Sequence, residues 1–237
     1  MAHHALRQLA DALAERTPTA YERAVKPVVD LVLAVILLVV LSPLLALIAL
    51  AVLVAVGRPV LIGQERAGRD GEPFTMLKFR TMRHDRRVQR DDRRRAERRR
   101  RRRLRGAVGN DRRSGDRRVT HKTLDDPRHT RTGLLLRKLS LDELPQLCNV
   151  IIGDMSLVGP RPELAHLTEQ FEPWQHARHR VRPGITGLWQ TTKRADGLLL
   201  HECIDLDLHD IAELSARTDL AILLRTPAAL LRNKGVI

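Results

Sequence analysis

Two adjacent carboxylates, Asp142 and Glu143, stand where the sequence predicts the start of a helix. Ser140 lies three residues before Glu143, which is the spacing of a capping box, and an apolar run follows. Pro145 falls in the second turn and predicts an irregular helix opening. Helix amides stabilise an ionised carboxylate and favour phosphate, so one carboxylate could attack phosphorus while the other holds a divalent cation. The structural alternative is a simple helix start.

Chemistry on a phosphoryl group also requires cations aimed at the oxygens that gain charge. Arg137 lies five residues before Asp142, and Arg161 stands between two prolines that stiffen its backbone. Lys78 and Arg80 follow an apolar segment and supply two more cations. Each of these cations, taken alone, could equally be a solvated or headgroup-binding charge.

The apolar segment runs for 26 residues, from Leu31 to Val56, and Ser42 is its only polar residue. A straight helix of that length would measure roughly 39 Å, which exceeds the hydrocarbon thickness of about 30 Å. Pro43 removes a backbone donor and clashes with the carbonyl four residues earlier, so the sequence predicts a break at Ser42-Pro43. Each half is then too short to span a membrane alone.

Two topologies fit a broken run of this kind: a kinked spanning helix, or a re-entrant hairpin that enters one leaflet and returns. Positive charges flank the run on both sides, with Arg23 and Lys26 before it and Arg58 and Arg66 after it. The positive-inside rule assigns both flanks to the cytoplasm, which favours the hairpin. Before it, residues 5–16 predict an amphipathic helix that lies either at the membrane interface or on the protein's own body.

A net charge of +14 suggests a nucleic-acid partner, but the distribution of that charge argues against one. Residues 86–118 contain 17 arginines and 5 acids, so this Arg-rich insert carries +12. Such a run cannot form a core and is expected to be disordered or to lie on anionic lipid. Aromatic residues make up only 3% of the chain and leave few side chains to stack on bases. We therefore expect no nucleic-acid partner.

The 237-residue length predicts one domain, or one domain with an appendage. Short extended segments are expected at 59–63 and 74–82 around a turn at 68–71, and helical spacing over 206–224 is expected to end before Pro227. The two cysteines exclude a disulfide scaffold, and the histidines show no metal-ligand spacing. These patterns predict a mostly helical α/β protein.

Five sequence blocks occur together in the order and spacing of one protein family. They are QERAGRDGEPF at 64–74, KFRTM at 78–82, DDPRHTRTG at 125–133, LRKLSLDELPQLCNVIIGDMSLVGPRPE at 136–163 and RPGITGLWQ at 182–190. From Lys26 onward the chain resembles the bacterial sugar transferases that act on polyprenyl phosphate, the monotopic phosphoglycosyl transferases. Agreement of five separate strings makes a chance match not credible.

This resemblance implies a membrane-embedded enzyme that transfers a sugar 1-phosphate from a nucleoside diphosphate sugar, usually a UDP-sugar, to polyprenyl phosphate, with release of UMP. It implies Asp142 as the nucleophile of a covalent phosphosugar intermediate and Glu143 as the ligand of Mg²⁺. It also matches Ser42-Pro43 to the family's break, and so implies the re-entrant helix-break-helix.

The resemblance bears on the remaining candidate residues as well. Motif positions favour Lys78, Arg137 and Arg161 as phosphate-binding cations, with Arg80 beside them. Asp207 matches a family acid at the active site, and the alternative is an exposed helix acid.

The combined prediction is a monotopic, membrane-anchored α/β protein with an amphipathic segment (1–25), a re-entrant hairpin (26–57) and a cytoplasm-facing catalytic domain (58–237). Its expected place is the bacterial plasma membrane, with anionic lipids as partners and homo-oligomers allowed. Its expected role is the first membrane step of an exopolysaccharide, capsule, O-antigen or glycoprotein glycan. The main alternative is a membrane-tethered protein that binds acidic polymers through the insert. A transferase that forms a glycosidic bond would release UDP instead of UMP, and the Asp-Glu pair disfavours it.

Overall fold

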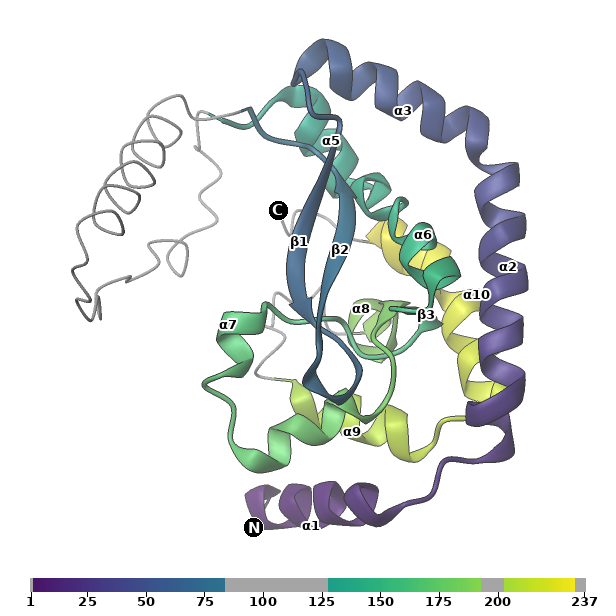
Figure 1. Cartoon of the computed structure of the whole chain (residues 1–237), viewed down its shortest axis with the longest axis vertical. Helices are drawn as coiled ribbons and strands as arrows, with labels where there is room; N and C mark the ends of the chain where they lie inside the picture. Colours follow the sequence, from purple (N-terminus) through teal and green to yellow (C-terminus); the bar gives the residue numbers. More distant parts are fainter. Residues whose placement is uncertain (1, 84–127, 193–202, 233–237) are drawn as a thin grey trace, which may run out of the picture.

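The computed structural model describes residues 2–83, 128–192 and 203–232 (Figure 1), so the Arg-rich insert lies outside the described residues. In chain order the elements are α1 (Ala2–Glu15), the π-helical turn η1 (Tyr21–Val25), α2 (Lys26–Val40), α3 (Ser42–Ala55), β1 (Leu61–Ala67), the 3₁₀ turn η2 (Arg69–Gly71), β2 (Pro73–Phe79), α5 (Arg131–Lys138), the 3₁₀ turn η4 (Leu141–Glu143), α6 (Gln146–Ile152), β3 (Ser156–Val158), α7 (Ala165–Thr168), the 3₁₀ segment η5 (Pro173–Arg180), β4 (Gly184–Thr186), α8 (Leu188–Thr192), α9 (Ile204–Ala212) and α10 (Ala216–Arg232). The described residues are mostly helical, as predicted, with two small two-stranded sheets.

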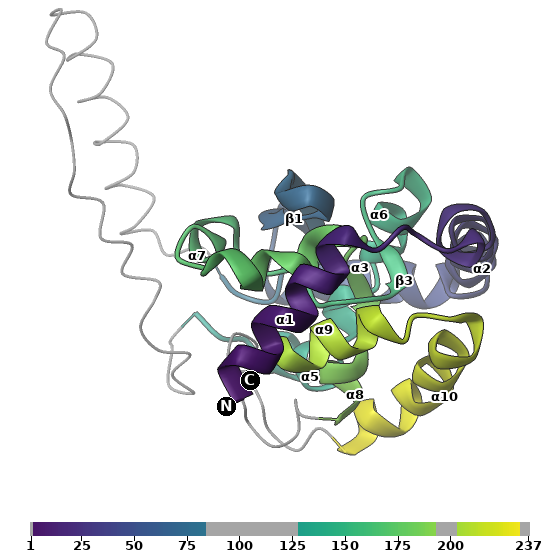
Figure 2. The same cartoon turned by 90° about the horizontal axis from the view of Figure 1, so that it is seen from below.

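The N-terminal helix α1 packs on the protein's own body. Ala10 and Leu13 of its apolar face are buried beside Ile204 and Leu208 of α9. Figure 2, which views the molecule from below, shows α1 lying across α9. Of the two predicted positions for this amphipathic helix, the structure shows the packed one. The helix ends at Glu15, just before Thr17-Pro18-Thr19.

The apolar run forms two helices that meet at the predicted break. Within the described residues no single helix is long and apolar enough to cross a membrane, but Tyr21–Val40 and Ser42–Ala55 together have the required length and composition, and they are bent by 63°. Pro43 lies in the first turn of α3, where a missing N–H is tolerated, and the Ser42 hydroxyl donates to the Val39 carbonyl at 2.8 Å. The predicted break at Ser42-Pro43 is confirmed.

A β-hairpin follows the helix pair directly. Its strands β1 and β2 are antiparallel, with Leu61 opposite Phe79 and Ala67 opposite Pro73, around the turn predicted at 68–71. Asn149 of α6 is fully buried and fixes β2 from the side: its Oδ1 accepts from the Leu77 amide at 2.9 Å, and its Nδ2 donates to the Thr75 carbonyl at 2.8 Å. This bridge sets the position of Lys78, the next residue along the strand.

A second, parallel pair joins β3 to β4 and brings two glycine-containing loops into contact. A Cβ on Gly184 would stand 2.1 Å from the amide nitrogen of Gly159, a separation that no side chain can adopt. The Gly184 amide donates to the Pro160 carbonyl at 2.9 Å. Glycine is therefore required here by close backbone approach, and the contact holds the segment that carries Arg161.

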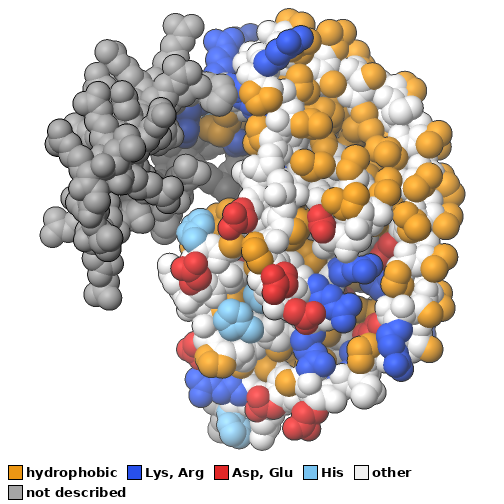
Figure 3. Space-filling model, in the orientation of Figure 1, with side chains coloured by type: hydrophobic (Ala, Val, Ile, Leu, Met, Phe, Trp, Pro, Cys, Tyr) orange, Lys and Arg blue, Asp and Glu red, His pale blue; other side chains and the backbone are white. Residues whose placement is uncertain are grey.

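The core lies between the helix pair and the body. Ala34 of α2 packs with Met76 of β2 and Leu147 of α6, and Ile48 and Val52 of α3 pack in a second cluster. Few residues of α2 and α3 are buried, so each of these helices buries only a narrow stripe. Its remaining apolar side chains lie on the outer surface, along the right and upper edge of Figure 3.

The C-terminal helical region differs from the prediction. Two helices, α9 and α10, replace the single helix expected over 206–224, and α10 continues through Pro227. The expectation that the helix stops before Pro227 was wrong. The chain breaks earlier because Ser215 and Thr218 cap the start of α10 reciprocally: the Ser215 amide donates to the Thr218 hydroxyl at 2.9 Å, and the Thr218 amide donates to the Ser215 hydroxyl at 3.3 Å.

Candidate active site

The carboxylate pair lies on a tight turn and not at the start of a long helix. Ser140 has a left-handed backbone (φ 54°) and does not cap the turn, so the predicted capping box is not formed. Leu141–Glu143 makes one 3₁₀ turn, and α6 begins only after Pro145. The irregular opening predicted from Pro145 is confirmed. The pair is therefore positioned by the junction between α5 and α6 and, contrary to the prediction from the sequence, does not lie at the N-terminus of an α-helix.

Two cations hold the Glu143 carboxylate. Lys78 Nζ lies 3.0 Å from Glu143 Oε1, and Arg161 places Nη2 at 2.6 Å from Oε1 and Nη1 at 3.2 Å from Oε2. The Glu143 side chain is only 9% exposed, so these contacts act in a poorly hydrated place. Burial lowers the pKa of Lys78, whereas for Arg161 the Glu143 carboxylate overcomes the effect of burial and raises the pKa. Both side chains nevertheless present positive charge to one carboxylate.

Asp142 is buried beside this cluster. Burial raises its pKa above the ordinary value, and the neighbouring Glu143 charge raises it further. Lys78, Arg137 and Arg161 act in the opposite direction and favour the ionised form. The structure thus brings four of the predicted residues together at Asp142 and Glu143, with Arg137 near enough to act on Asp142 electrostatically.

Arg137 is held by α5 and the segment after β2. Its Nε donates to the Thr81 hydroxyl at 2.8 Å, and Nη1 lies 3.2 Å from His129 Nε2. Gly133 makes this approach possible, because a Cβ there would stand 1.9 Å from the Thr81 carbonyl oxygen. The close contact between α5 and Thr81 therefore fixes the guanidinium that acts electrostatically on Asp142.

Arg161 is supported from behind by a buried ion pair. Arg178 Nη2 donates to the Arg161 carbonyl at 2.6 Å and lies 2.7 Å from Asp207 Oδ2. The Arg178 side chain is 0% exposed and that of Asp207 is 2% exposed. Burial raises the pKa of Asp207, and Arg178 opposes that shift. Asp207 therefore contacts the site through Arg178 and the backbone of Arg161.

Arg80 makes its hydrogen bonds outside this cluster. Its Nε donates to the Met82 carbonyl at 2.9 Å, and its Nη1 donates to the Arg58 carbonyl at 2.5 Å. The side chain is buried and braces the end of β2 against the segment that leaves α3. A phosphate-binding role for Arg80 stays a prediction.

Sequence reasoning missed three residues that position the site: Asn149, Arg178 and His129. A lone polar residue inside the apolar run LCNVII was a signal for Asn149. No comparable signal separated Arg178 from Arg180 and Arg182, its basic neighbours.

The two carboxylates match the small number of protein ligands that Mg²⁺ requires. Mg²⁺ is commonly bound through one or two carboxylates, with water and substrate phosphates as the other ligands. Asp142 and Glu143 are adjacent, buried and mutually repulsive, which a divalent cation would relieve. The described part of the chain holds no group of three or more His, Cys, Asp or Glu residues that could bind a metal. Mg²⁺ therefore stays a proposal that depends on substrate oxygens.

A buried acid pair beside lysine and arginine defines the class of site: one suited to anionic, phosphate-bearing substrates. Comparison with known proteins gives the family. The bacterial sugar transferase family matches residues 21–233. An exopolysaccharide production protein, ExoY, from Sinorhizobium fredii is 37% identical over 206 residues, covering 87% of this chain and 85% of its own length.

Two further relatives have more specific names. UDP-glucose:undecaprenyl-phosphate glucose-1-phosphate transferase from Escherichia coli is 36% identical over 86% of this chain, which spans only 39% of that longer protein. Its namesake from Caulobacter vibrioides is 38% identical over 87% of this chain and 69% of its own length. The chain belongs to the bacterial sugar transferase family, and the predicted family resemblance is confirmed.

Proposed function

We propose that this protein transfers a sugar 1-phosphate from a UDP-sugar to polyprenyl phosphate. The observation that carries the proposal is the pair of ion pairs that Lys78 and Arg161 form with Glu143, next to the buried Asp142. The names of the Escherichia coli and Caulobacter vibrioides relatives, both glucose-1-phosphate transferases to undecaprenyl phosphate, support the reaction class. Assembly of an exopolysaccharide or a related surface glycan is the proposed pathway role.

In the first step an Asp142 carboxylate oxygen attacks the phosphorus next to the sugar. The new bond joins Asp142 to that phosphorus, the bond to the bridging oxygen breaks, and UMP leaves with the electron pair. The pKa of Asp142 is raised, so the Lys78, Arg137 and Arg161 charges are needed to keep the nucleophile ionised. A phosphosugar is then carried on the enzyme.

In the second step an oxygen of polyprenyl phosphate attacks the same phosphorus. The bond to Asp142 breaks, the carboxylate is restored, and the polyprenyl diphosphosugar is released. Lys78 and Arg161 neutralise charge on the phosphoryl oxygens in both steps, since the incoming phosphates compete with Glu143 for these cations. Glu143 and Asp142 are the residues that would hold Mg²⁺, which supplies charge neutralisation and orientation of the diphosphate when bound.

The acceptor lipid requires a membrane position, and we propose that α2 and α3 form a re-entrant hairpin. Their outward side chains are apolar and exposed, with Val28 at 60%, Val39 at 67% and Val54 at 80%. Figure 3 shows hydrophobic side chains gathered along this edge, and exposed apolar surfaces of this kind mark interaction sites, including membrane contacts.

The position of α1 supports the re-entrant form over a spanning helix. α1 precedes the helix pair α2–α3 in the chain, and it packs against α9 and η5, which come after the helix pair. A spanning helix would place these packed elements on opposite sides of a bilayer. We therefore propose that both flanks lie on one face, the cytoplasmic one.

The test is UMP release by the purified protein with UDP-sugars, Mg²⁺ and polyprenyl phosphate. Asp142→Asn and Glu143→Gln are expected to abolish UMP release and the lipid product, whereas the exposed-acid controls Asp11→Asn and Glu169→Gln should turn over normally. Mass analysis after UDP-sugar alone should detect the phosphosugar adduct in the unsubstituted enzyme. Full activity of Asp142→Asn would refute the covalent mechanism.

Deletion of residues 86–118 separates this proposal from the polymer-binding alternative. A transferase should retain most of its turnover without the insert, because the carboxylate cluster is built from other segments.

UDP as the released nucleotide would instead indicate direct glycosidic transfer.

A further inference from the structure

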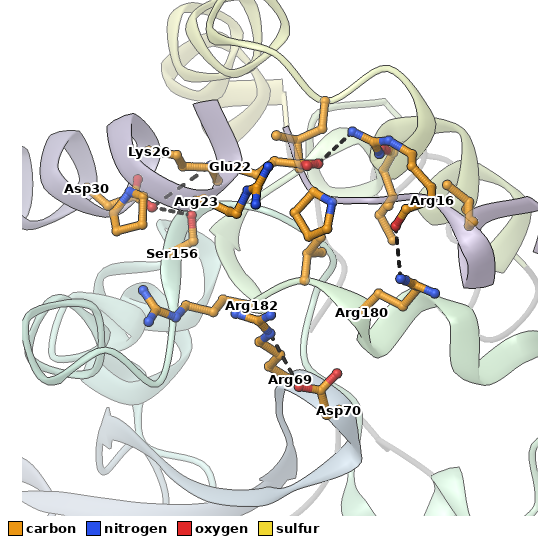
Figure 4. A pocket seen from close by; sticks show the side chains of 16 residues that line it. Arg16, Glu22, Arg23, Lys26, Asp30, Arg69, Asp70, Ser156, Arg180 and Arg182 are labelled. Carbon is orange, nitrogen blue, oxygen red and sulfur yellow. Dashed lines mark hydrogen bonds and ion pairs between the residues drawn. The ribbon is translucent and has the colours of Figure 1, made fainter. Parts of the chain in front are cut away.

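A cavity of about 440 Å³ lies outside the carboxylate cluster, between the start of α2, the β1–β2 turn and the segment that enters β4. Figure 4 shows the side chains that line it. Its cations are Arg16, Arg23, Lys26, Arg69, Arg180 and Arg182, and its acids are Glu22, Asp30 and Asp70. The lining does not include Asp142 or Glu143. The cavity is therefore distinct from the carboxylate cluster, and cations outnumber acids in its lining.

Several of these cations are already neutralised. The ion pairs are Arg16 with Glu22 at 2.8 Å, Lys26 with Asp219 at 2.5 Å and Arg69 with Asp70 at 3.3 Å. Arg180 directs its guanidinium to the backbone carbonyls of Ala14 and Arg16. Lys26 also lies 3.9 Å from Asp30, which accepts a hydrogen bond from Ser156 at 2.6 Å. These contacts form a rigid wall.

Arg23 and Arg182 differ from the other cations. Neither side chain makes a hydrogen bond or ion pair with another residue in the ranges 2–83, 128–192 and 203–232. They come from distant parts of the chain and lie on opposite sides of the cavity in Figure 4. Two unpaired guanidinium groups facing one hollow attract an anion, and their planar forks match phosphate oxygens.

The cavity adjoins the apolar outer face of α2. Val25, the last residue of η1, is 49% exposed and Val28 of α2 is 60% exposed, and in the sequence they flank Lys26 and Pro27 of the cavity wall. Figure 3 shows blue side chains gathered next to the hydrophobic surface of the lower end of α2. A group bound between Arg23 and Arg182 would thus have apolar surface beside it.

We infer that this cavity binds the phosphodiester headgroup of an anionic phospholipid, and that the adjoining apolar face favours the lipid over free phosphate by contacting its acyl chains. The site is separate from the proposed transfer reaction, because its lining residues are distinct from the carboxylate cluster. Bound lipid would hold the base of α2 through Arg23 and the body through Arg182.

The experiment measures the thermal unfolding midpoint of the full chain in an uncharged detergent. Short-chain phosphatidylglycerol, short-chain phosphatidylcholine and inorganic phosphate are added separately. Phosphatidylglycerol should raise the midpoint, and Arg23→Gln/Arg182→Gln should weaken its apparent affinity about tenfold or more. The control Arg131→Gln/Arg217→Gln removes the same charge from exposed positions outside the cavity and should behave as the unsubstituted protein.

Each outcome decides the inference. An equal response to inorganic phosphate keeps the anion site but identifies free phosphate as its occupant. Equal responses of the cavity variant and its control would overturn the inference. Native mass spectrometry of retained phosphatidylglycerol provides a second readout that does not depend on unfolding. Because UMP release is not measured, failure here leaves the proposed function untouched.

Discussion

Arg161 forms a two-point contact with Glu143, with Nη2 at 2.6 Å from Oε1 and Nη1 at 3.2 Å from Oε2. Lys78 reaches the same Oε1 from β2 at 3.0 Å. Both cations are therefore paired with one carboxylate in this structure. In the proposed reaction an incoming diphosphate would replace Glu143 as their partner, which would couple substrate binding to the release of that carboxylate.

Arg161→Lys is expected to lower turnover about a hundredfold. Lysine keeps the charge but not the planar fork, so one oxygen of Glu143 or of the phosphate loses its donor. Stability should also fall by about 1–3 kcal/mol, because an oxygen of the buried Glu143 carboxylate loses a donor. Steady-state UMP release checks this, with Arg217→Lys on the exposed face of α10 as control. A rate within a factor of about two of the unsubstituted enzyme would contradict the role of the fork.

Asp207→Asn and Arg178→Met are each expected to destabilise the protein by about 3–5 kcal/mol. Each change leaves one buried charge without its partner. Because Arg178 also holds the Arg161 carbonyl, turnover should fall even at temperatures where the variants are folded. Denaturant unfolding and UMP release measure the two effects separately.

The double variant Asp207→Asn/Arg178→Met tests whether these residues act as a pair. Its loss of stability should be smaller than the sum of the single losses, since no unpaired charge remains. Strict additivity would show that the 2.7 Å contact between them carries no coupling.

Asp210→Asn is expected to stabilise the protein at neutral and higher pH. Burial, with the charges of Asp207 and Asp219, raises the pKa of Asp210 from 3.8 to about 7. The folded state then keeps a proton that the unfolded chain releases, so stability falls as pH rises from about 4 to 7. The variant escapes this loss and should gain on the order of 1–3 kcal/mol near pH 8.

Thermal unfolding across pH checks this prediction. The difference between Asp210→Asn and the unsubstituted protein should shrink as pH falls through the folded pKa of about 7 and disappear near the ordinary pKa of 3.8. A difference that is constant with pH would show that packing, and not ionisation, causes it.

If α2 and α3 form a re-entrant hairpin, cysteines placed before and after it should react with a maleimide from the same face of the membrane. Gln8→Cys on α1 and Glu72→Cys beside the β-hairpin turn are exposed reporters, to be placed in a chain whose Cys148 and Cys203 are replaced. An impermeant maleimide should modify both reporters in inside-out vesicles and neither in right-side-out vesicles. Labelling from opposite faces would establish a spanning helix.

Local chemistry made several elements predictable from sequence. Pro43 indicated the break, and the turn at 68–71 indicated the β-hairpin. The failures occur where tertiary contacts override local pattern. Ser140 had the spacing of a cap, yet it adopts a left-handed backbone, and Glu143 faces Lys78 and Arg161 instead.

The candidate site was predictable in its residues but not in its supporting contacts. Lys78 and Arg80 are two apart and would share a face of a longer strand, but β2 ends at Phe79 and Arg80 turns to backbone carbonyls. Arg178 is buried because α9 packs over it with Asp207, and that packing has no signature in the basic run around it.

The contact of Gly159 with Gly184 closes the chain between them into a loop. Residues 160–183 leave and return at nearly one point in space, so the ends of this segment are fixed by the parallel β3–β4 pair. Extra residues at the exposed turn Glu169–Gln170 would add only a small loop-closure entropy. The stretch from Arg178 to Gly184 has no such freedom, because Arg178 binds the Arg161 carbonyl. The turn after α7 can therefore accept insertions while Arg161 keeps its place.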